Sequence, residues 1–170
     1  MRYLWGETMK TRDQGPVGTS EEMDVLQTQF LMSQQEQTVN PLEELEAQLR
    51  ERIKELDCLY RLTNLIEQYE DSLDEILQEA VDLLPISWQY PEIACARIRY
   101  REQVFKSSNF KGSKWRQKSP IVIAGHEEGM VEVRYLKKKP EQDEGPFLKE
   151  ERQLIDAVSN RIARAVERIN

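Results

Sequence analysis

Hydrophobic residues recur at alternating steps of three and four positions in two segments of this chain, a spacing typical of amphipathic helices. The first segment begins at Asn40, where three helix-start signals coincide. Asn40 suits an N-cap, Pro41 suits the first helical position, and Glu43 stands at the third. We therefore predict a long amphipathic, coiled-coil-type helix over residues 40–70, about 45 Å long at 1.5 Å per residue.

The second segment predicts a long C-terminal helix over residues 146–169, opening at Pro146. An apolar stripe with charged flanks normally packs against another helix. We expect the two long helices to lie side by side and to form a four-helix bundle with a second copy of the chain, although the first helix alternatively folds back on its own domain. The predicted dimer seam comprises Leu42, Leu45, Leu49, Ile53, Leu56, Ile155, Val158 and Ile162. Residues 59–66 are expected to pack on their own domain.

Between the long helices, the pattern predicts one short helix and an antiparallel sheet. Ser72 and Glu75 form a capping-box pattern, so a helix over 72–84 is expected to end at Pro85. Alternating or strongly apolar runs separated by polar turns predict antiparallel strands. They lie at 93–100, 104–110, 117–124 and 130–136, with 125–129 as a turn. The predicted fold class is α+β: an antiparallel sheet flanked by a long N-terminal amphipathic helix and a C-terminal helix.

The first 39 residues differ in character from the remainder. Residues 11–20 are rich in glycine, threonine and polar side chains, which indicates a flexible extension. Met23, Leu26 and Phe30 would share one face of a short helix over 20–36. The expected organisation is an extension over 1–39, the helix over 40–70, and a compact domain over 71–170.

Composition narrows the class of protein. The chain has 170 residues, of which 32% are charged, and its net charge is −7, so nothing global indicates a nucleic-acid binder. No apolar run approaches the ~18 residues of a membrane span. The first residues also lack the apolar centre of a secretory signal. We therefore predict a cytoplasmic protein without a membrane span.

Residues with catalytic chemistry are scarce. His126 is the only histidine and lies in the predicted turn, while Cys58 and Cys95 fall in different elements and are expected to be buried thiols. This set is too small for a metal site or a nucleophilic triad, and the seven glycines form no phosphate loop. We expect neither catalysis nor a cofactor, although an enzyme using aspartate, glutamate, lysine or tyrosine stays open.

One segment departs from the acidic average. Residues 97–118 contain eight basic side chains and only one acidic side chain, Glu102, with aromatic residues interleaved. Such a segment fits a cationic face that meets acidic helices or an acidic partner. A small acidic ligand or nucleic acid, stacking on the aromatic rings, is the alternative. The candidate surface comprises Trp88, Arg97, Arg99, Phe110, Trp115 and Arg116.

About two thirds of the chain resembles a known family. The matching stretches are ELDCLYRLTNLIE (55–67), SWQYPEIACARI (87–98), the spacing of Phe105, Asn109, Phe110 and Trp115, and a long C-terminal run, VEVRYLKKKPEQDEGPFLKEERQLIDAVSNRIARAVER (131–168). They resemble small GAF-like sensory modules that precede histidine-kinase cores and phosphoenolpyruvate-synthase-like enzymes in bacteria and archaea.

This resemblance implies a GAF-like sheet flanked by helices, cytoplasmic dimerisation, and relay of a signal along the helices. It implies no particular ligand. The cyclic-nucleotide signature of some GAF domains is missing, and Cys95 lacks the nearby histidine of bilin-binding ones. The sequence ends at Asn170 without a kinase core, so we expect a non-catalytic sensory or adaptor module acting on a separate protein, such as a histidine kinase.

Overall fold

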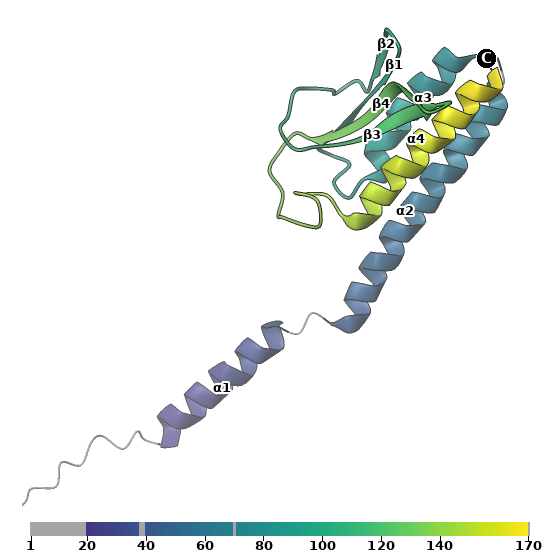
Figure 1. Ribbon diagram of the computed structural model, residues 1–170. Helices are drawn as coiled ribbons and strands as arrows, with labels where there is room; N and C mark the ends of the chain where they lie inside the picture. The colour runs from purple at the N-terminus through teal and green to yellow at the C-terminus, as the bar shows by residue number, and fades with distance from the viewer. Residues whose placement is uncertain (1–19, 38–39, 70, 170) are drawn as a thin grey trace, which may run out of the picture. The chain divides into compact units, whose positions relative to one another are not determined.

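The computed structural model describes residues 20–37, 40–69 and 71–169 (Figure 1). Within them it contains four helices and one four-stranded antiparallel sheet. The predicted α+β class is therefore confirmed, together with a long helix before the sheet and a long C-terminal helix after it. The chain divides into two compact units between Glu44 and Leu45, and each is described by itself.

The first unit contains helix α1, Ser20–Gln37, at the place where the sequence predicts a helix over 20–36. Its large apolar side chains, among them Met23, Leu26 and Phe30, are exposed. The predicted flexible stretch over residues 1–19 lies outside the described residues.

Helix α2, Pro41–Gln68, starts in the first unit and continues into the second. The side-chain oxygen of Asn40 accepts a hydrogen bond of 3.2 Å from the backbone N–H of Leu42. This bond satisfies one of the free N–H groups of the first turn, so Asn40 is the N-cap that the sequence predicts.

Helix α3, Leu73–Ser87, differs from the prediction at both ends. Ser72 precedes the helix, but its side chain makes no capping hydrogen bond, so the predicted capping box is wrong. The helix also continues past Pro85 to Ser87. A proline in the last turn removes only one backbone hydrogen bond, and the Ser87 hydroxyl donates to the Leu83 carbonyl at 3.1 Å in the same turn.

The sheet has the strand order β2-β1-β4-β3. Its strands are β1 (Ala94–Tyr100), β2 (Gln103–Lys106), β3 (Arg116–Ile123) and β4 (His126–Tyr135). The turn between β3 and β4 is shorter than predicted, because Ala124 and Gly125 both adopt positive φ, of 49° and 83°. Two such residues suffice for a tight hairpin, so residues 126–129 extend β4 instead of forming the turn.

Two further boundaries differ from the predictions. Strand β2 ends at Lys106. Ser107 still donates its N–H to the Ala96 carbonyl at 3.0 Å, but the Phe110 N–H donates to the Ser107 carbonyl at 3.0 Å and closes a turn there. Helix α4, Lys149–Ile169, begins three residues after Pro146. The Glu151 carboxylate accepts the Leu148 N–H at 2.7 Å, which fixes the start of this helix.

The helices of the second unit lie on one side of the sheet (Figure 1). Helix α3 packs on β1 and β2, and α4 packs mainly on β3. The C-terminal half of α2 lies against α4, as hydrogen bonds from Arg161 and Arg168 to the carbonyls of Leu59 and Ile66 show, and it borders a groove together with α3. The helix-facing side of the sheet and these helices form one continuous core, which includes Leu62, Trp88, Ile98, Tyr135, Phe147 and Ile162.

Candidate functional site

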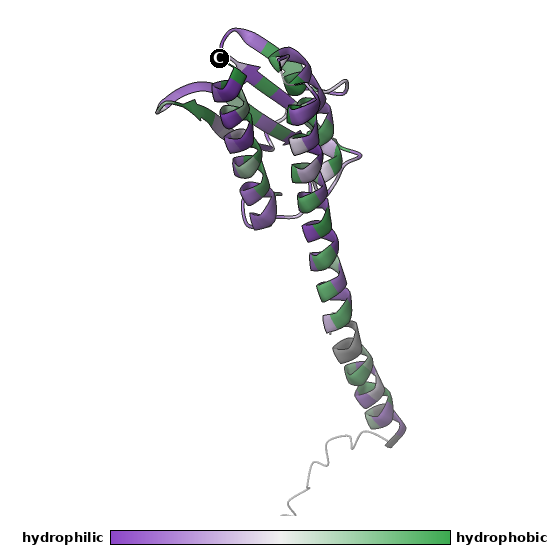
Figure 2. Cartoon of the chain, turned by 90° about the vertical axis from the view of Figure 1, so that its right-hand side faces the viewer, coloured by the Kyte–Doolittle hydropathy of each residue, from purple (hydrophilic) through white to green (hydrophobic). Residues whose placement is uncertain are grey.

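The predicted seam residues of α2 lie on an exposed apolar stripe. Leu42, Leu45, Leu49, Ile53 and Leu56 each leave 57–61% of their surface open to solvent. Apolar positions recur along the length of α2 in Figure 2. No part of the chain within residues 20–37, 40–69 and 71–169 buries these side chains, so they are available to a partner.

The opposite side of α2 packs on the domain. Glu55, Cys58 and Leu62 are buried, with at most 7% exposure. At 100° per residue, they lie about 150° around the helix from the residues Leu45 to Leu56. One helix therefore carries two distinct apolar faces, and the sheet domain covers only one of them.

The three seam residues predicted on the C-terminal helix are placed differently. Ile155, Val158 and Ile162 are almost completely buried in the core of their own chain, where α4 packs on the sheet. Their inclusion in a seam between copies is wrong, because they offer no surface to a second molecule. The exposed face of α4 is polar, with Gln153, Asn160, Arg164 and Glu167.

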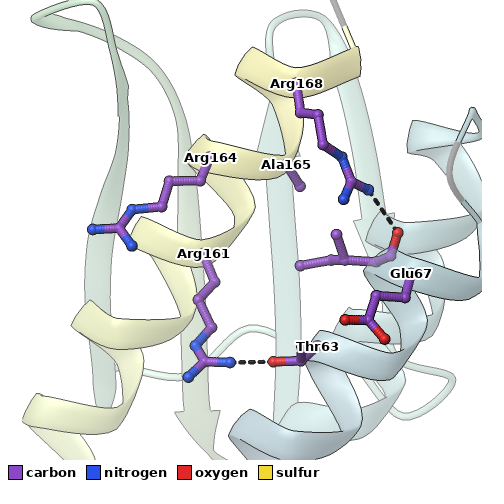
Figure 3. A pocket seen from close by; sticks show the side chains of 7 residues that line it. Thr63, Glu67, Arg161, Arg164, Ala165 and Arg168 are labelled. Carbon is purple, nitrogen blue, oxygen red and sulfur yellow. Dashed lines mark hydrogen bonds between the residues drawn. The ribbon is translucent and has the colours of Figure 1, made fainter.

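Beyond Leu56, α2 becomes part of the domain, as the sequence predicts. Leu59 and Ile66 are partly buried against the core. A groove of about 320 Å³ lies between this half of α2 and α4 (Figure 3). Three arginines of α4, at 161, 164 and 168, line it together with Glu67. Arg161 and Arg168 donate to α2 acceptors, whereas Arg164 points away from α2 (Figure 3).

A second groove, of about 410 Å³, lies on the other side of α2, against α3. Glu79 and Asp82 of α3 line it, together with Arg61, Asn64 and Gln68 of α2. The two grooves that flank the C-terminal half of α2 thus differ in charge: arginines dominate the α4 side, and carboxylates dominate the α3 wall.

The residues predicted as a ligand or partner surface do not form one surface. Trp88 is completely buried, and its indole N–H donates to Gln117 at 3.4 Å, so its assignment to a surface is wrong. Trp115 packs partly against the core, and the Lys114 ammonium lies 5.0 Å from its ring centre. Trp88 follows the end of α3 and lies in no strand, whereas Trp115 directly precedes Arg116 of β3 and therefore points to the opposite face of the sheet.

Arg97, Arg99 and Arg116 do share a face, the side of the sheet that the helices leave uncovered. At its centre, the Glu132 carboxylate is 1% exposed and receives hydrogen bonds from Arg97 at 3.0 Å and from Arg134 at 2.8 Å. The Phe110 ring lies over this cluster, with both guanidinium carbons about 5 Å from its centre.

Glu132 and Arg134 were missed as members of this face, and Lys118 was counted only as part of the basic segment 97–118. The signal was present, because Glu132 and Arg134 alternate with Val131 and Val133. Antiparallel pairing of β1, β4 and β3 then places Glu132 between Arg97 and Lys118. A search confined to one basic segment could not find a surface built from three strands.

A buried polar cluster joins α4 to the sheet at the other end of the domain. The Glu151 carboxylate accepts hydrogen bonds from the Tyr135 hydroxyl at 2.6 Å and from the Gln89 N–H at 2.7 Å. Burial raises the pKa of Glu151 above its usual value, and burial beside this carboxylate raises the pKa of Tyr135 as well. The cluster is closed to substrates and holds the start of α4 in place.

The remaining candidates for chemistry lie apart. Cys58 and Cys95 are both buried thiols, and burial raises the pKa of Cys58 to about 11, which suppresses the reactive thiolate. His126 is exposed at the first position of β4 rather than in a turn. Within residues 20–37, 40–69 and 71–169, no group of three or more histidine, cysteine, aspartate or glutamate side chains could hold a metal ion.

None of the described helices is long and apolar enough to cross a bilayer. Comparison with known proteins gives no match to a family model, to a curated protein or to a solved structure.

Proposed function

We propose that this chain is a non-catalytic regulatory module of GAF-like type, which pairs with a second copy through α2 and relays a signal to a separate protein. One observation carries the proposal: the apolar stripe from Leu45 to Leu56 is exposed, while the face of α2 about 150° away is buried in the domain. A helix that is apolar on two sides needs a partner on each.

A dimer seam fits the chemistry of the stripe better than a membrane surface or a ligand does. Charged residues flank it, and Asp57 and Arg61 form an ion pair of 2.9 Å within the helix. Leucines and isoleucine at helical spacing with charged flanks are typical of helix pairing.

The energy of such a seam suits a reversible dimer. Full burial of one leucine or isoleucine side chain stabilises by about 1.5–3 kcal/mol relative to exposure. Four partly exposed residues from each copy therefore contribute on the order of 10 kcal/mol, against an association cost of about 4–15 kcal/mol. At the low end of that cost about 6 kcal/mol remains, which corresponds to a dissociation constant of some tens of micromolar, so we expect a weak, reversible dimer.

The relay rests on the continuity of α2. Leu45, Leu49 and Leu56 belong to the proposed seam, and Cys58 and Leu62 of the same helix belong to the core. A rotation or shift of α2 in the seam would therefore change how α2 packs on α3 and α4. The separate output protein, such as a histidine kinase, would respond to that change.

Sedimentation velocity of the full chain across concentrations from about 1 to 100 µM tests the first step, around the affinity expected above. We expect the sedimentation coefficient to rise from the monomer value to the dimer value. A monomer throughout this range would exclude the proposed pairing and the relay that depends on it.

A further inference from the structure

The uncovered face of the sheet is strongly basic in an acidic protein. We call it the open sheet face; it contains Arg97, Arg99, Lys106, Arg116, Lys118, Met130, Glu132 and Arg134. Cross-strand pairing places these residues in three rows, because Arg116 pairs with Arg134, Lys118 and Arg97 both pair with Glu132, and Arg99 pairs with Met130. These residues include six cations and one carboxylate, on a chain whose net charge is −7; Glu127, opposite Val122, adds a second carboxylate at the end of the face.

Three of these cations are already held in place. Glu132 forms ion pairs with both Arg97 and Arg134, and these two guanidinium groups offset its negative charge towards an incoming anion. The Phe110 ring lies over the two guanidinium groups, and the Lys106 ammonium lies 5.8 Å from the ring centre. This cluster forms a rigid platform in the middle of the face.

The other three cations are available for a ligand. Among the described residues, Arg99, Arg116 and Lys118 make no side-chain hydrogen bond or ion pair, and both arginine side chains are exposed. Arg99 and Lys118 border a hollow of about 80 Å³, whose other walls are Arg97, Met130 and Glu132. Since one liquid water occupies about 30 Å³, the hollow has room for a carboxylate group but not for a larger organic molecule.

The spacing of the free cations fits an extended acidic chain. Arg116 and Lys118 are alternate residues of β3, so their side chains share one face and their Cα atoms lie about 7 Å apart. Carboxylates at alternate positions of an extended peptide have the same spacing. Nucleic acid fits less well, because cations already lie against the rings of Phe110 and Trp115, where a stacking base would compete with them.

Addition of a further strand at the edge of the sheet is blocked on the β3 side. Arg152 donates to the Lys118 carbonyl at 2.7 Å and Ser159 donates to the Pro120 carbonyl at 2.8 Å. Pro120 also lacks an N–H group. A partner must therefore lie across the open sheet face rather than pair with β3.

We propose that the open sheet face binds an acidic, extended segment of another protein, with one carboxylate seated between Arg99 and Lys118. This site is separate from the apolar stripe of α2 and does not depend on dimer formation.

Fluorescence anisotropy of the full chain with a labelled ten-residue peptide of alternating glutamate and threonine tests the proposal. A glutamine–threonine peptide is the neutral control. We expect binding of the acidic peptide at low salt, weakened at about 0.3 M salt by screening. Arg99→Glu with Lys118→Glu should weaken binding by roughly tenfold or more, because two attractive charges become repulsive.

The matched control is Lys149→Glu with Arg164→Glu, which changes the net charge equally at exposed positions on α4. It should bind the peptide almost as well as the unaltered chain does. If the first double variant does not fold, as judged by circular dichroism, Arg99→Gln with Lys118→Gln replaces it, with the same expected direction.

Three results would overturn the proposal. The first is no binding of the acidic peptide at low salt, or an equal loss in the α4 control. The second is displacement of the peptide by millimolar inorganic phosphate at matched ionic strength, which would assign the face to a small anion. The third is tighter binding of oligothymidine than of the peptide through Arg99 and Lys118, which would assign it to nucleic acid.

Discussion

Arg161 on α4 donates a hydrogen bond of 3.0 Å to the carbonyl oxygen of Leu59 on α2, across 102 positions of sequence. The same guanidinium also donates to the hydroxyl of Thr63, which itself donates to Leu59 at 2.8 Å. These bonds mark the point where α2 joins the domain. The exposed stripe ends just before Leu59, so the proposed seam and the half of α2 that packs on the domain meet here.

Removing this link should loosen α2. Arg161→Ala deletes the bonds to Leu59 and Thr63, and since the side chain is only half-buried we expect a loss of about 1 kcal/mol in the free energy of unfolding. Arg164→Ala is the matched control, because Arg164 lines the same groove but points away from α2 (Figure 3). It should change stability by less than about 0.5 kcal/mol. Urea denaturation at one fixed protein concentration measures both, and equal losses would show that the bonds do not matter.

The buried Glu151 should make stability depend on pH in a defined direction. Burial raises the pKa of Glu151 in the folded chain, so the folded state holds this proton more tightly than the unfolded state. The stabilising contribution of Glu151 to the free energy of unfolding is therefore fully present below the pKa of about 4.3 in the unfolded chain. It is lost as the pH rises through the pKa of Glu151 in the folded chain.

Glu151→Gln removes this titration. The variant loses part of the hydrogen bonding to Tyr135 and Leu148, so we expect it to be less stable than the unaltered chain at pH 4. The deficit should shrink as the pH rises towards 7, because only the carboxylate carries the cost of ionising in a buried site. Thermal unfolding at several pH values tests this, and a deficit that grows with pH would contradict it.

The two grooves beside α2 predict the orientation of the dimer. In a parallel pair, the two-fold axis runs along α2. The arginine-lined groove of one copy then lies beside the carboxylate-lined groove of the other copy, at the same position along the helix. In an antiparallel pair, the two-fold axis is perpendicular to α2. The two arginine-lined grooves then lie on one side of the pair and the two carboxylate-lined grooves on the other. Because opposite charges favour encounter and register, we expect parallel helices.

Disulfide crosslinking of single cysteine variants tests the orientation. Leu56→Cys should crosslink to itself under oxidation, because equivalent positions face each other in a parallel pair. The buried Cys58 and Cys95 serve as the internal control, since the unaltered chain should not crosslink. An antiparallel pair would instead crosslink only a mixture of Leu45→Cys and Leu56→Cys.

Periodicity predicted the helices well because helix starts and apolar faces are local features. Asn40 shows this, since its capping role follows from the next three residues. The part of the molecule that covers an apolar face, in contrast, is set by contacts between residues far apart in the sequence. Leu49 and Ile162 have the same kind of spacing, yet Leu49 is exposed and Ile162 is buried, because only the arrangement of the sheet decides which stripe it covers.

The candidate surface was predicted only in part for a similar reason. Arg97 and Arg99 alternate along one strand and were assigned correctly to one side, but Trp88 precedes the strand and turns into the core. The centre of the face is Glu132, which lies 35 positions from its partner Arg97. Such a contact depends on strand order and register, which one sequence does not determine.

Sedimentation velocity of Leu49→Glu with Leu56→Glu decides whether α2 pairs with a second copy, with Gln153→Glu and Asn160→Glu as a control of equal charge on the exposed face of α4. Burying two carboxylates in an apolar seam is strongly unfavourable. At concentrations where the unaltered chain is dimeric, we expect a folded monomer for the α2 variant and a dimer for the α4 control. A dimeric α2 variant, or equal dissociation of both, would contradict it.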